Sequence, residues 1–378
     1  MNFDNIIGQD FLKAHFKRII AQNRVPHTQL FVGEEGTGTL PLALAFAEEL
    51  LCGGNENCQQ KVRKLIHPDL HFVYPTVTTD RIKKPESDAF LPQWRDFLKE
   101  KPYGSLYNWL SFLEVANKQG LIRVSDAEEL LKKIAVKPYE AAYKVIIIWQ
   151  AEKMNNETAN KLLKILEEPP EDTKFILTAQ KTDDILPTIL SRCQIHHFKP
   201  IPIDDIKQEL INKYNFTTEK ALKIAHQANG SWQRALDLAG NEETDDEFQK
   251  LFIEWVRVAF SAKKDKQAIR KLISWSEKLA TMGREMQKQF LEFALESFRQ
   301  ALMINYQSAE LAYYDFSKNK FDINKLAPFI HSGNIEAIYQ SVTDAQYHIE
   351  RNANPKLIFL NLSIGLTKLI HQKEKPLS

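Results

Sequence analysis

The chain has 378 residues, of which 43% are hydrophobic and 26% are charged, a composition typical of soluble globular proteins and incompatible with a disordered chain. Its 50 lysine and arginine residues nearly balance 49 aspartate and glutamate residues, so the net charge of +1 provides no global attraction to nucleic acid or membranes. The three cysteines are too few for a disulfide framework. With no export signal at the N-terminus and no long apolar run, we expect a cytoplasmic protein of two or three domains.

Residues 1–199 are predicted to form an α/β domain. Short apolar runs alternate with segments of helical periodicity, and the β-branched run at 145–148 is typical of a strand buried on both faces. This alternation predicts a parallel sheet with helices on both faces. The expected strands are 29–32, 70–74, 144–149, 174–178 and 194–198, and the expected helices are 40–51, 125–134 and 157–166.

Residues 76–120 fit neither pattern well. They contain a basic cluster, Arg81, Lys83 and Lys84, and several aromatic residues, among them Trp94 and Trp109. We expect a partly helical surface insertion that is packed by its own aromatic side chains.

Beyond residue 199 the strand patterns stop, and the rest of the chain is predicted to be helical. Residues 200–242 form a small helical domain, and the acidic run at 242–247 marks either a surface linker or the N-terminus of a helix. Residues 243–378 form a second all-α domain, where apolar residues such as Ile338, Val342 and Ala345 recur at spacings of three and four.

A glycine-rich loop lies between the first strand and the next helix, which is the setting in which a P-loop binds phosphates. Its glycines are Gly33, Gly36 and Gly38. Two positions that carry the chemistry are replaced, however. Thr39 stands where a lysine would reach the β- and γ-phosphates, and Leu40 stands where a hydroxyl would bind Mg²⁺.

The acidic residues that would hold the metal ion are also missing. Trp149 and Gln150 follow the strand at 144–148 where carboxylates belong, and Glu152 comes two or three residues late, at a position expected on the surface of the next helix. Glu34 and Glu35 add negative charge where a triphosphate would lie. The degenerate loop and acidic motif therefore predict that the chain holds no nucleotide cofactor, although an active ATPase with a degenerate loop stays open.

Several motifs resemble the bacterial clamp-loader branch of the AAA+ proteins. They are IIGQ at 6–9, YKVIII at 143–148, AEKMN at 151–155, ANKLLKILEEPP at 159–170 and LPTILSRCQ at 186–194. The resemblance covers about residues 1–240 and implies an AAA+ ATPase-like domain at 1–199, a helical lid at 200–242 and a helical collar for oligomerisation at 243–378. In lacking the loop lysine and the acidic residues, the chain resembles the family's non-hydrolysing subunits rather than its ATP-hydrolysing gamma/tau subunits.

The triplet Ser191, Arg192 and Cys193 is the most specific of these motifs. In this family the ATP sites lie between subunits, so the resemblance implies that Arg192 acts in trans as an arginine finger on the γ-phosphate of a neighbouring gamma/tau subunit. Ser191 and Cys193 would fix the loop. The implied partners are gamma/tau and delta subunits, which bind the ATP and Mg²⁺, together with the sliding clamp and primed DNA. A scaffold in which Arg192 makes only a salt bridge within the fold stays open.

Many members of this family carry a four-cysteine zinc module near residue 55. Only Cys52 and Cys58 remain in this chain. Because tetrahedral zinc needs four convergent ligands, we expect no metal here and read the two cysteines as the remnant of the module, present as buried, reduced thiols.

Overall fold

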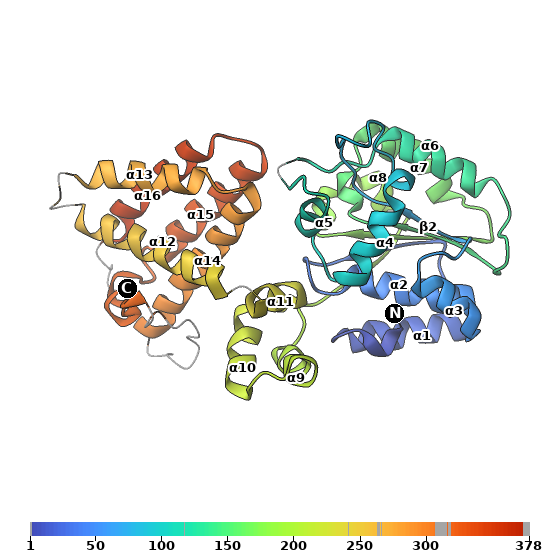
Figure 1. The fold of residues 1–378 in the computed structure, drawn as a ribbon, viewed down its shortest axis with the longest axis horizontal. Helices are drawn as coiled ribbons and strands as arrows, with labels where there is room; N and C mark the ends of the chain where they lie inside the picture. Colours follow the sequence, from blue (N-terminus) through green and yellow to red (C-terminus); the bar gives the residue numbers. More distant parts are fainter. Residues whose placement is uncertain are drawn as a thin grey trace. The chain divides into compact units, whose positions relative to one another are not determined.

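The structure is a computed structural model that describes residues 2–116, 118–240, 242–262, 265, 267–306, 316 and 319–372. The chain forms two compact units, Met1–Asp237 and Leu238–Ser378 (Figure 1). The first contains the sheet, and the second is built from helices throughout its described residues. The predicted division at residues 199 and 242, with the lid as a domain of its own, stays a prediction.

The first unit is built around a parallel five-stranded sheet with the order β2-β3-β4-β1-β5. The strands are β1 (Thr28–Val32), β2 (Leu70–Val73), β3 (Lys144–Ile148), β4 (Thr173–Ala179) and β5 (Gln194–His197). All five expected strands are present within one residue at each end. Strands β1, β3 and β4 are buried along their whole length, because helices cover both faces of the sheet.

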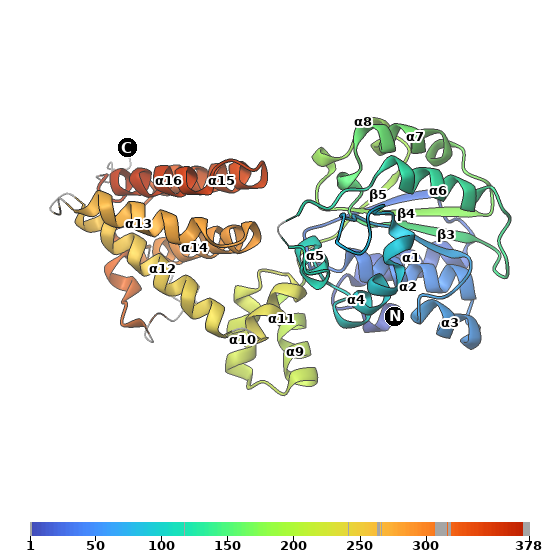
Figure 2. The ribbon, with the colours of Figure 1, turned by 45° about the horizontal axis from the view of Figure 1, so that its top comes forward.

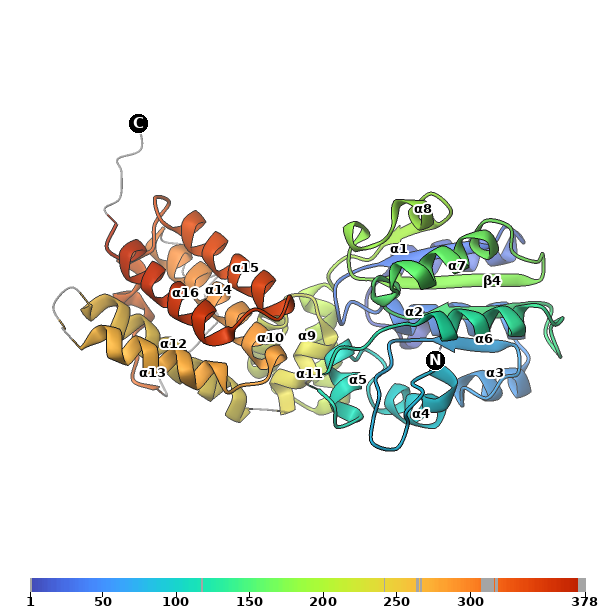
Figure 3. The ribbon, with the colours of Figure 1, turned by 90° about the horizontal axis from the view of Figure 1, so that it is seen from above.

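The two faces of the sheet carry separate layers of helices (Figure 2). One layer consists of α1 (Asp10–Ala21), α2 (Thr39–Cys52), α3 (Glu56–Arg63), α4 (Leu91–Glu100) and α5 (Leu106–Phe112), and the other of α6 (Val124–Ile134), α7 (Asn156–Glu167) and α8 (Pro187–Leu190). Alternate strand residues serve the two layers: Ile147 and Ile176 pack with the first, and Ile146 and Leu177 with the second. Helices α6 and α7 lie side by side (Figure 3). The predicted α/β fold class is confirmed.

Residues 76–120 join the domain core instead of forming a surface insertion packed only by its own aromatic side chains. Trp94 does contact Trp109, with ring centroids 5.2 Å apart, but it also stacks on Tyr74 at 4.1 Å and contacts Trp149 at 5.0 Å. The expected helices are present as α4 and α5. The correction arises because Tyr74 and Trp149, which follow β2 and β3, carry the aromatic cluster onto the sheet.

After β5 the first unit continues with α9 (Ile203–Tyr214), α10 (Thr218–Gln227) and α11 (Trp232–Gly240). In α9 Ile206 and Leu210 are fully buried, whereas Tyr214, which follows them at helical spacing, is 47% exposed. Helices α9 and α10 pack against each other. No further strand occurs in the described residues after β5, as the sequence predicts.

The second unit is a bundle of helices. They are α12 (Glu242–Ser261), α13 (Ala268–Ala280), α14 (Arg284–Asn305), α15 (Ile335–Glu350) and α16 (Pro355–Leu369). Helix α12 begins inside the acidic run, so that run is a helix N-terminus rather than a linker. Trp255 and Trp275 stack in the core at 5.1 Å, and the predicted stripe of α15 is buried at Ile338 and Val342. Among the described residues, no helix has the length and apolarity needed to cross a membrane.

The aromatic cluster gives a test of the core. Trp109 is fully buried and its Nε1 donates to the Pro75 carbonyl at 2.8 Å. We expect Trp109→Ala to lower the free energy of unfolding by about 3–5 kcal/mol, because it leaves a large cavity and an unpaired carbonyl. The measurement is urea unfolding followed by circular dichroism. Tyr139→Ala, at a side chain 84% exposed, is the control and should cost less than about 0.5 kcal/mol; equal losses for both variants would contradict the described core.

Candidate functional site

The glycine-rich loop lies at the carboxyl edge of the sheet, where β1, β3 and β4 end side by side. The backbone N–H of Gly33 continues the pairing with β4 by donating to the Ala179 carbonyl at 3.0 Å. Gly36 and Gly38 have φ values of +80° and +99°, a region that glycine adopts without strain, and Gly38 is the N-cap residue of α2. The predicted strand–loop–helix arrangement of a P-loop is therefore present.

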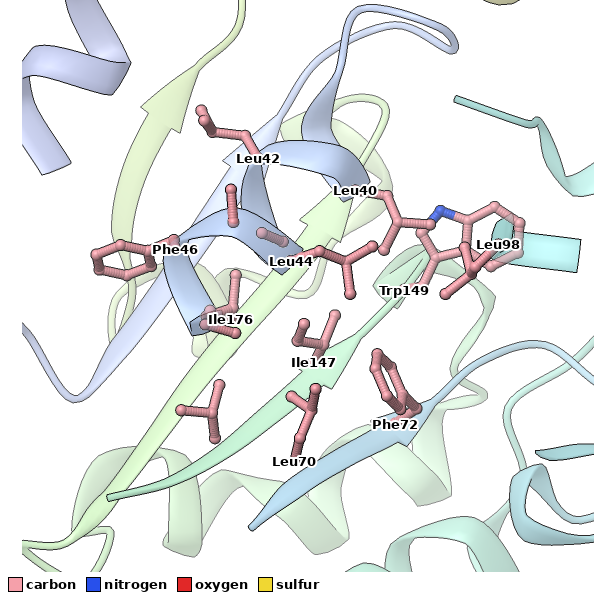
Figure 4. Close-up of a cluster of buried hydrophobic side chains, with 14 of the residues drawn as sticks. Leu40, Leu42, Leu44, Phe46, Leu70, Phe72, Leu98, Ile147, Trp149 and Ile176 are labelled. Atoms are coloured by element: carbon pink, nitrogen blue, oxygen red, sulfur yellow. The ribbon is translucent and has the colours of Figure 1, made fainter. Parts of the chain in front are cut away.

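Apolar side chains fill the place where a P-loop protein would hold its metal ion. Leu40 is 3% exposed and Trp149 is 2% exposed, and both belong to the core beneath α2. Figure 4 shows the Leu40 side chain directed at the indole of Trp149, with Leu98 on the other side of the ring. Phe97 also contacts that indole, with ring centroids 6.2 Å apart. Mg²⁺ takes oxygen ligands and keeps much of its water, so these neighbours offer it no coordination.

The space left beside the loop is small. A cavity of about 20 Å³ is lined by residues of the loop and of the strand ends, including Thr39, Tyr103, Gln150 and Gln180. This volume is enough for one water molecule. The Gln150 side chain is 6% exposed, and its Oε1 has no hydrogen-bond partner in the part of the chain that the structure describes. Its backbone N–H donates to the Thr178 hydroxyl at 3.1 Å.

The sequence suggested that Glu152 lies on the surface of the next helix, but it is partly buried in a turn at the strand ends. It sits in a 3₁₀ turn, Ala151–Lys153, and its Oε1 accepts the backbone N–H of Gln180 at 3.3 Å. Its Oε2 has no partner among the described residues, and burial raises the pKa of Glu152 to about 7. The turn is tight because Gln150 has a φ of +57°, which directs the following residues back under the strand ends.

The loop is also tied to other parts of its own unit. Trp232, the first residue of α11, donates its backbone N–H to the Gly36 carbonyl at 2.9 Å. A Cβ at Gly36 would lie 2.0 Å from the Ser231 hydroxyl, so only glycine allows this approach. On the other side, Gln9 Nε2 donates to the Thr37 carbonyl at 3.1 Å. The start of α11 thus contacts the loop directly.

Arg192 follows α8 and precedes β5. Its Nε and one terminal nitrogen donate to the same oxygen of Glu167, Oε2, at 3.0 and 2.6 Å. The other terminal nitrogen donates to the Thr188 carbonyl at 2.8 Å and to the Ser191 hydroxyl at 3.3 Å. The side chains of Arg192 and Glu167 are 27% and 54% exposed. The salt bridge within the fold that the sequence left open is therefore present.

The neighbours of Arg192 in the triplet have different surroundings. Ser191 donates its hydroxyl to the Thr188 carbonyl at 3.1 Å, which closes the end of α8. Cys193 is half-buried, and burial raises the pKa of its thiol to about 12. This thiol is therefore protonated at neutral pH and is no nucleophile.

Cys52 and Cys58 form a disulfide, with Cα atoms 5.3 Å apart, so the prediction of reduced thiols is wrong. Cys52 is the last residue of α2 and Cys58 lies in α3. The physical reason is the turn between them, where Gly53 and Gly54 have φ values of +49° and +90° and return the chain toward the end of α2. No group of three or more metal-ligating side chains occurs among the described residues.

Glu152 generates a pH-dependent prediction. Its pKa of about 7 exceeds that of an exposed glutamate, so the folded chain binds this proton more tightly than the unfolded chain does. The resulting stability is complete below about pH 4 and is lost as the pH rises through about 7. Glu152→Gln keeps the shape without the buried charge, and we expect it to exceed the parent in unfolding free energy by about 1–3 kcal/mol near pH 8.5 and to match it near pH 4.

Thermal and urea unfolding across this pH range measure the effect. The exposed Glu34→Gln is the matched control, for which no pH-dependent gain is expected. A constant difference between Glu152→Gln and the parent at all pH values would contradict the burial of an ionisable carboxyl here.

Comparison with known proteins shows which family the chain resembles. A family model described as "DNA polymerase III, delta subunit" matches residues 8–202, just over half of the chain. The chain is 30% identical over 231 residues to DNA polymerase III subunit delta′ of Bacillus subtilis, covering 59% of this chain and 57% of that protein. It is 26% identical over 241 residues to DNA polymerase III subunit tau of Escherichia coli, covering 62% of this chain and 32% of that protein.

The similarity spans about half of the delta′ relative and a third of the tau relative. Among solved structures, a gamma subunit-related protein of DNA polymerase III from Thermotoga maritima has a TM-score of 0.40 and 15% identity, covering 95% of this chain and 99% of that one, a likeness too weak to add to the assignment. The family match and the delta′ and gamma/tau relatives lead to one conclusion: the chain belongs to the DNA polymerase III delta subunit family of clamp-loader proteins.

Proposed function

We propose that the chain is a non-hydrolysing subunit of a DNA polymerase III clamp loader, nearest to the delta′ type. In this role it works in the cytoplasm with gamma/tau and delta subunits to load a sliding clamp onto primed DNA. It binds no nucleotide itself, and it supplies Arg192 to the ATP site of a neighbouring gamma/tau subunit. The observation that carries the proposal is the combination of an apolar contact at the metal position with a partly exposed arginine in the Ser191–Cys193 triplet.

The contact of Leu40 with Trp149 supports the first half of this proposal. Nucleotide binding at a P-loop needs a lysine, a hydroxyl and acidic residues around a hydrated cation. Here Leu40 at the hydroxyl position and Trp149 at the first acidic position are buried in one apolar cluster, so a cation would have to displace packed side chains. The hydrogen bond from the backbone N–H of Trp232 to the Gly36 carbonyl further restrains the loop.

The surroundings of Arg192 support the second half. Guanidinium is permanently charged and forks onto phosphate oxygens, and arginine fingers of this kind are typically worth about 10³–10⁵ in rate. The end of α8 is closed by the hydrogen bond from Ser191, which presents Arg192 on a fixed turn. A charged finger on a firm support suits a subunit that acts on its neighbour and undergoes no ligand-driven change of its own.

Two other functions compete with this one. An active ATPase would need the degenerate loop to bind MgATP in some other way. A scaffold would use the same fold for assembly alone, with the pair of Arg192 and Glu167 serving only to hold α8 against α7. Nucleotide binding by the isolated chain and ATP hydrolysis by the complete loader distinguish these alternatives.

The first experiment tests nucleotide binding by the isolated chain. We expect millimolar MgATP to leave its thermal unfolding midpoint unchanged, since ligand binding to the native state would raise that midpoint. A gamma/tau subunit of the same organism is the positive control. An MgATP-dependent rise for this chain would overturn the proposed silence of the site and favour the active ATPase.

The second experiment tests the finger in a complete loader, reconstituted from the subunits of the same organism. We expect Arg192→Ala to lower the rate of hydrolysis about 10³-fold at the one ATP site that Arg192 serves. Gel filtration should show that the complex stays intact. Arg24→Ala is the matched control, because Arg24 is an exposed arginine far along the chain from the triplet. Full hydrolysis with Arg192→Ala would leave only the scaffold.

A further inference from the structure

The hydrogen bonds of Arg192 leave its guanidinium almost fully occupied inside its own chain. A guanidinium has five N–H bonds. Two of them donate to Glu167 Oε2, and two more are taken by the Thr188 carbonyl and the Ser191 hydroxyl. One N–H is left, whereas a fork onto a phosphate needs two parallel N–H groups. In this conformation Arg192 is therefore held away from the form of contact that makes an arginine finger effective.

Of these partners, only Glu167 carries a charge. It is the last residue of α7, where the helix dipole is negative and a carboxylate is unfavourable, so the pairing with Arg192 relieves a local repulsion. The carboxylate lies within 2.6 Å of the guanidinium, and a triphosphate that approached the same guanidinium would meet this negative charge. The carboxylate and the triphosphate are thus competitors for one cation.

The pair is also weak enough to be exchanged. Glu167 is 54% exposed and Arg192 is 27% exposed, and only one carboxylate oxygen accepts both hydrogen bonds. Exposed ion pairs of this kind contribute little to stability because water and salt screen them. A neighbouring site with a triphosphate and its surrounding charges offers Arg192 a stronger partner.

We propose that Glu167 is a latch that holds Arg192 in the free chain and releases it when a neighbouring subunit presents a nucleotide triphosphate. Glu167 is a positioning residue, since it acts only through Arg192. The inference rests on the proposed function, and it adds that engagement of the finger includes the exchange of one carboxylate for phosphate oxygens. No covalent step is involved.

The test measures ATP hydrolysis by the reconstituted loader over a range of MgATP concentrations, with clamp and primed DNA present. Glu167→Gln removes the competing charge and keeps the side-chain shape. We expect it to raise the rate at low MgATP two- to fivefold, about the range set by the strength of an exposed ion pair. Glu168→Gln is the matched control, because Glu168 is the next residue, is exposed, and has no described contact with Arg192. Thermal unfolding and gel filtration check that each variant folds and assembles.

The same variant in an Arg192→Ala background decides whether the effect passes through Arg192. The latch predicts that Glu167→Gln then changes nothing. If Arg192→Ala abolishes hydrolysis at its site but Glu167→Gln leaves the rate unchanged or lowers it, the latch is wrong and the finger stands. If Arg192→Ala has no effect on hydrolysis, the proposed function is wrong and the latch with it.

Discussion

The burial of Leu40 and Trp149 in one apolar cluster determines what the carboxyl edge of the sheet offers to a ligand. In a nucleotide-binding P-loop these two positions carry oxygen atoms around a hydrated metal ion. In this chain they carry a branched aliphatic side chain and an indole, both buried. The indole then extends the core outward, since Trp94 and Phe97 pack on it from α4. Leu40 and Trp149 thus put apolar side chains at the position of the cation site, and Trp149 also joins residues 76–120 to the core.

The hydrogen bonds that join the glycine-rich loop to the rest of its unit also bear on how the unit responds to a ligand. In a two-state protein a ligand shifts the equilibrium only through a difference in its affinity for the two states. In this chain the loop accepts a hydrogen bond from α11 at Gly36 and another from Gln9 at Thr37. We propose that a unit held in this way does not itself respond to ATP and instead presents Arg192 to a neighbour that does respond.

The sequence predicts the five strands and the helices α2, α6 and α7 to within about one residue, because β-branched runs and helical periodicity are local signals. It also identifies the replaced positions Leu40 and Trp149 one at a time. It does not show that these two side chains touch each other, because residues 109 positions apart meet only in the folded chain. The clustering of Trp149 with Trp94 was missed for the same reason, and so the insertion was placed on the surface.

The errors at the site have similar causes. The carboxylate of Glu167 is 25 residues from Arg192, and although it lies in a motif that the sequence singles out, no local pattern pairs the two. The residues around Glu152 predict a helix, and so the sequence places its side chain on the surface. The left-handed conformation of Gln150 turns it inward instead. The disulfide had a readable signal in the two glycines between Cys52 and Cys58, but cysteine number alone argued against it.

The proposed function requires that the glycine-rich loop bind no nucleotide. Hydrogen–deuterium exchange of the intact protein with and without MgATP tests this requirement at the backbone amides of Gly33, Thr37 and Trp232, each of which donates a hydrogen bond within the chain. We expect these amides to be protected from exchange to the same extent in both conditions, because α11 and the apolar core hold the loop without MgATP. Protection that appears only when MgATP is added would contradict it, since the loop would then be a working nucleotide site.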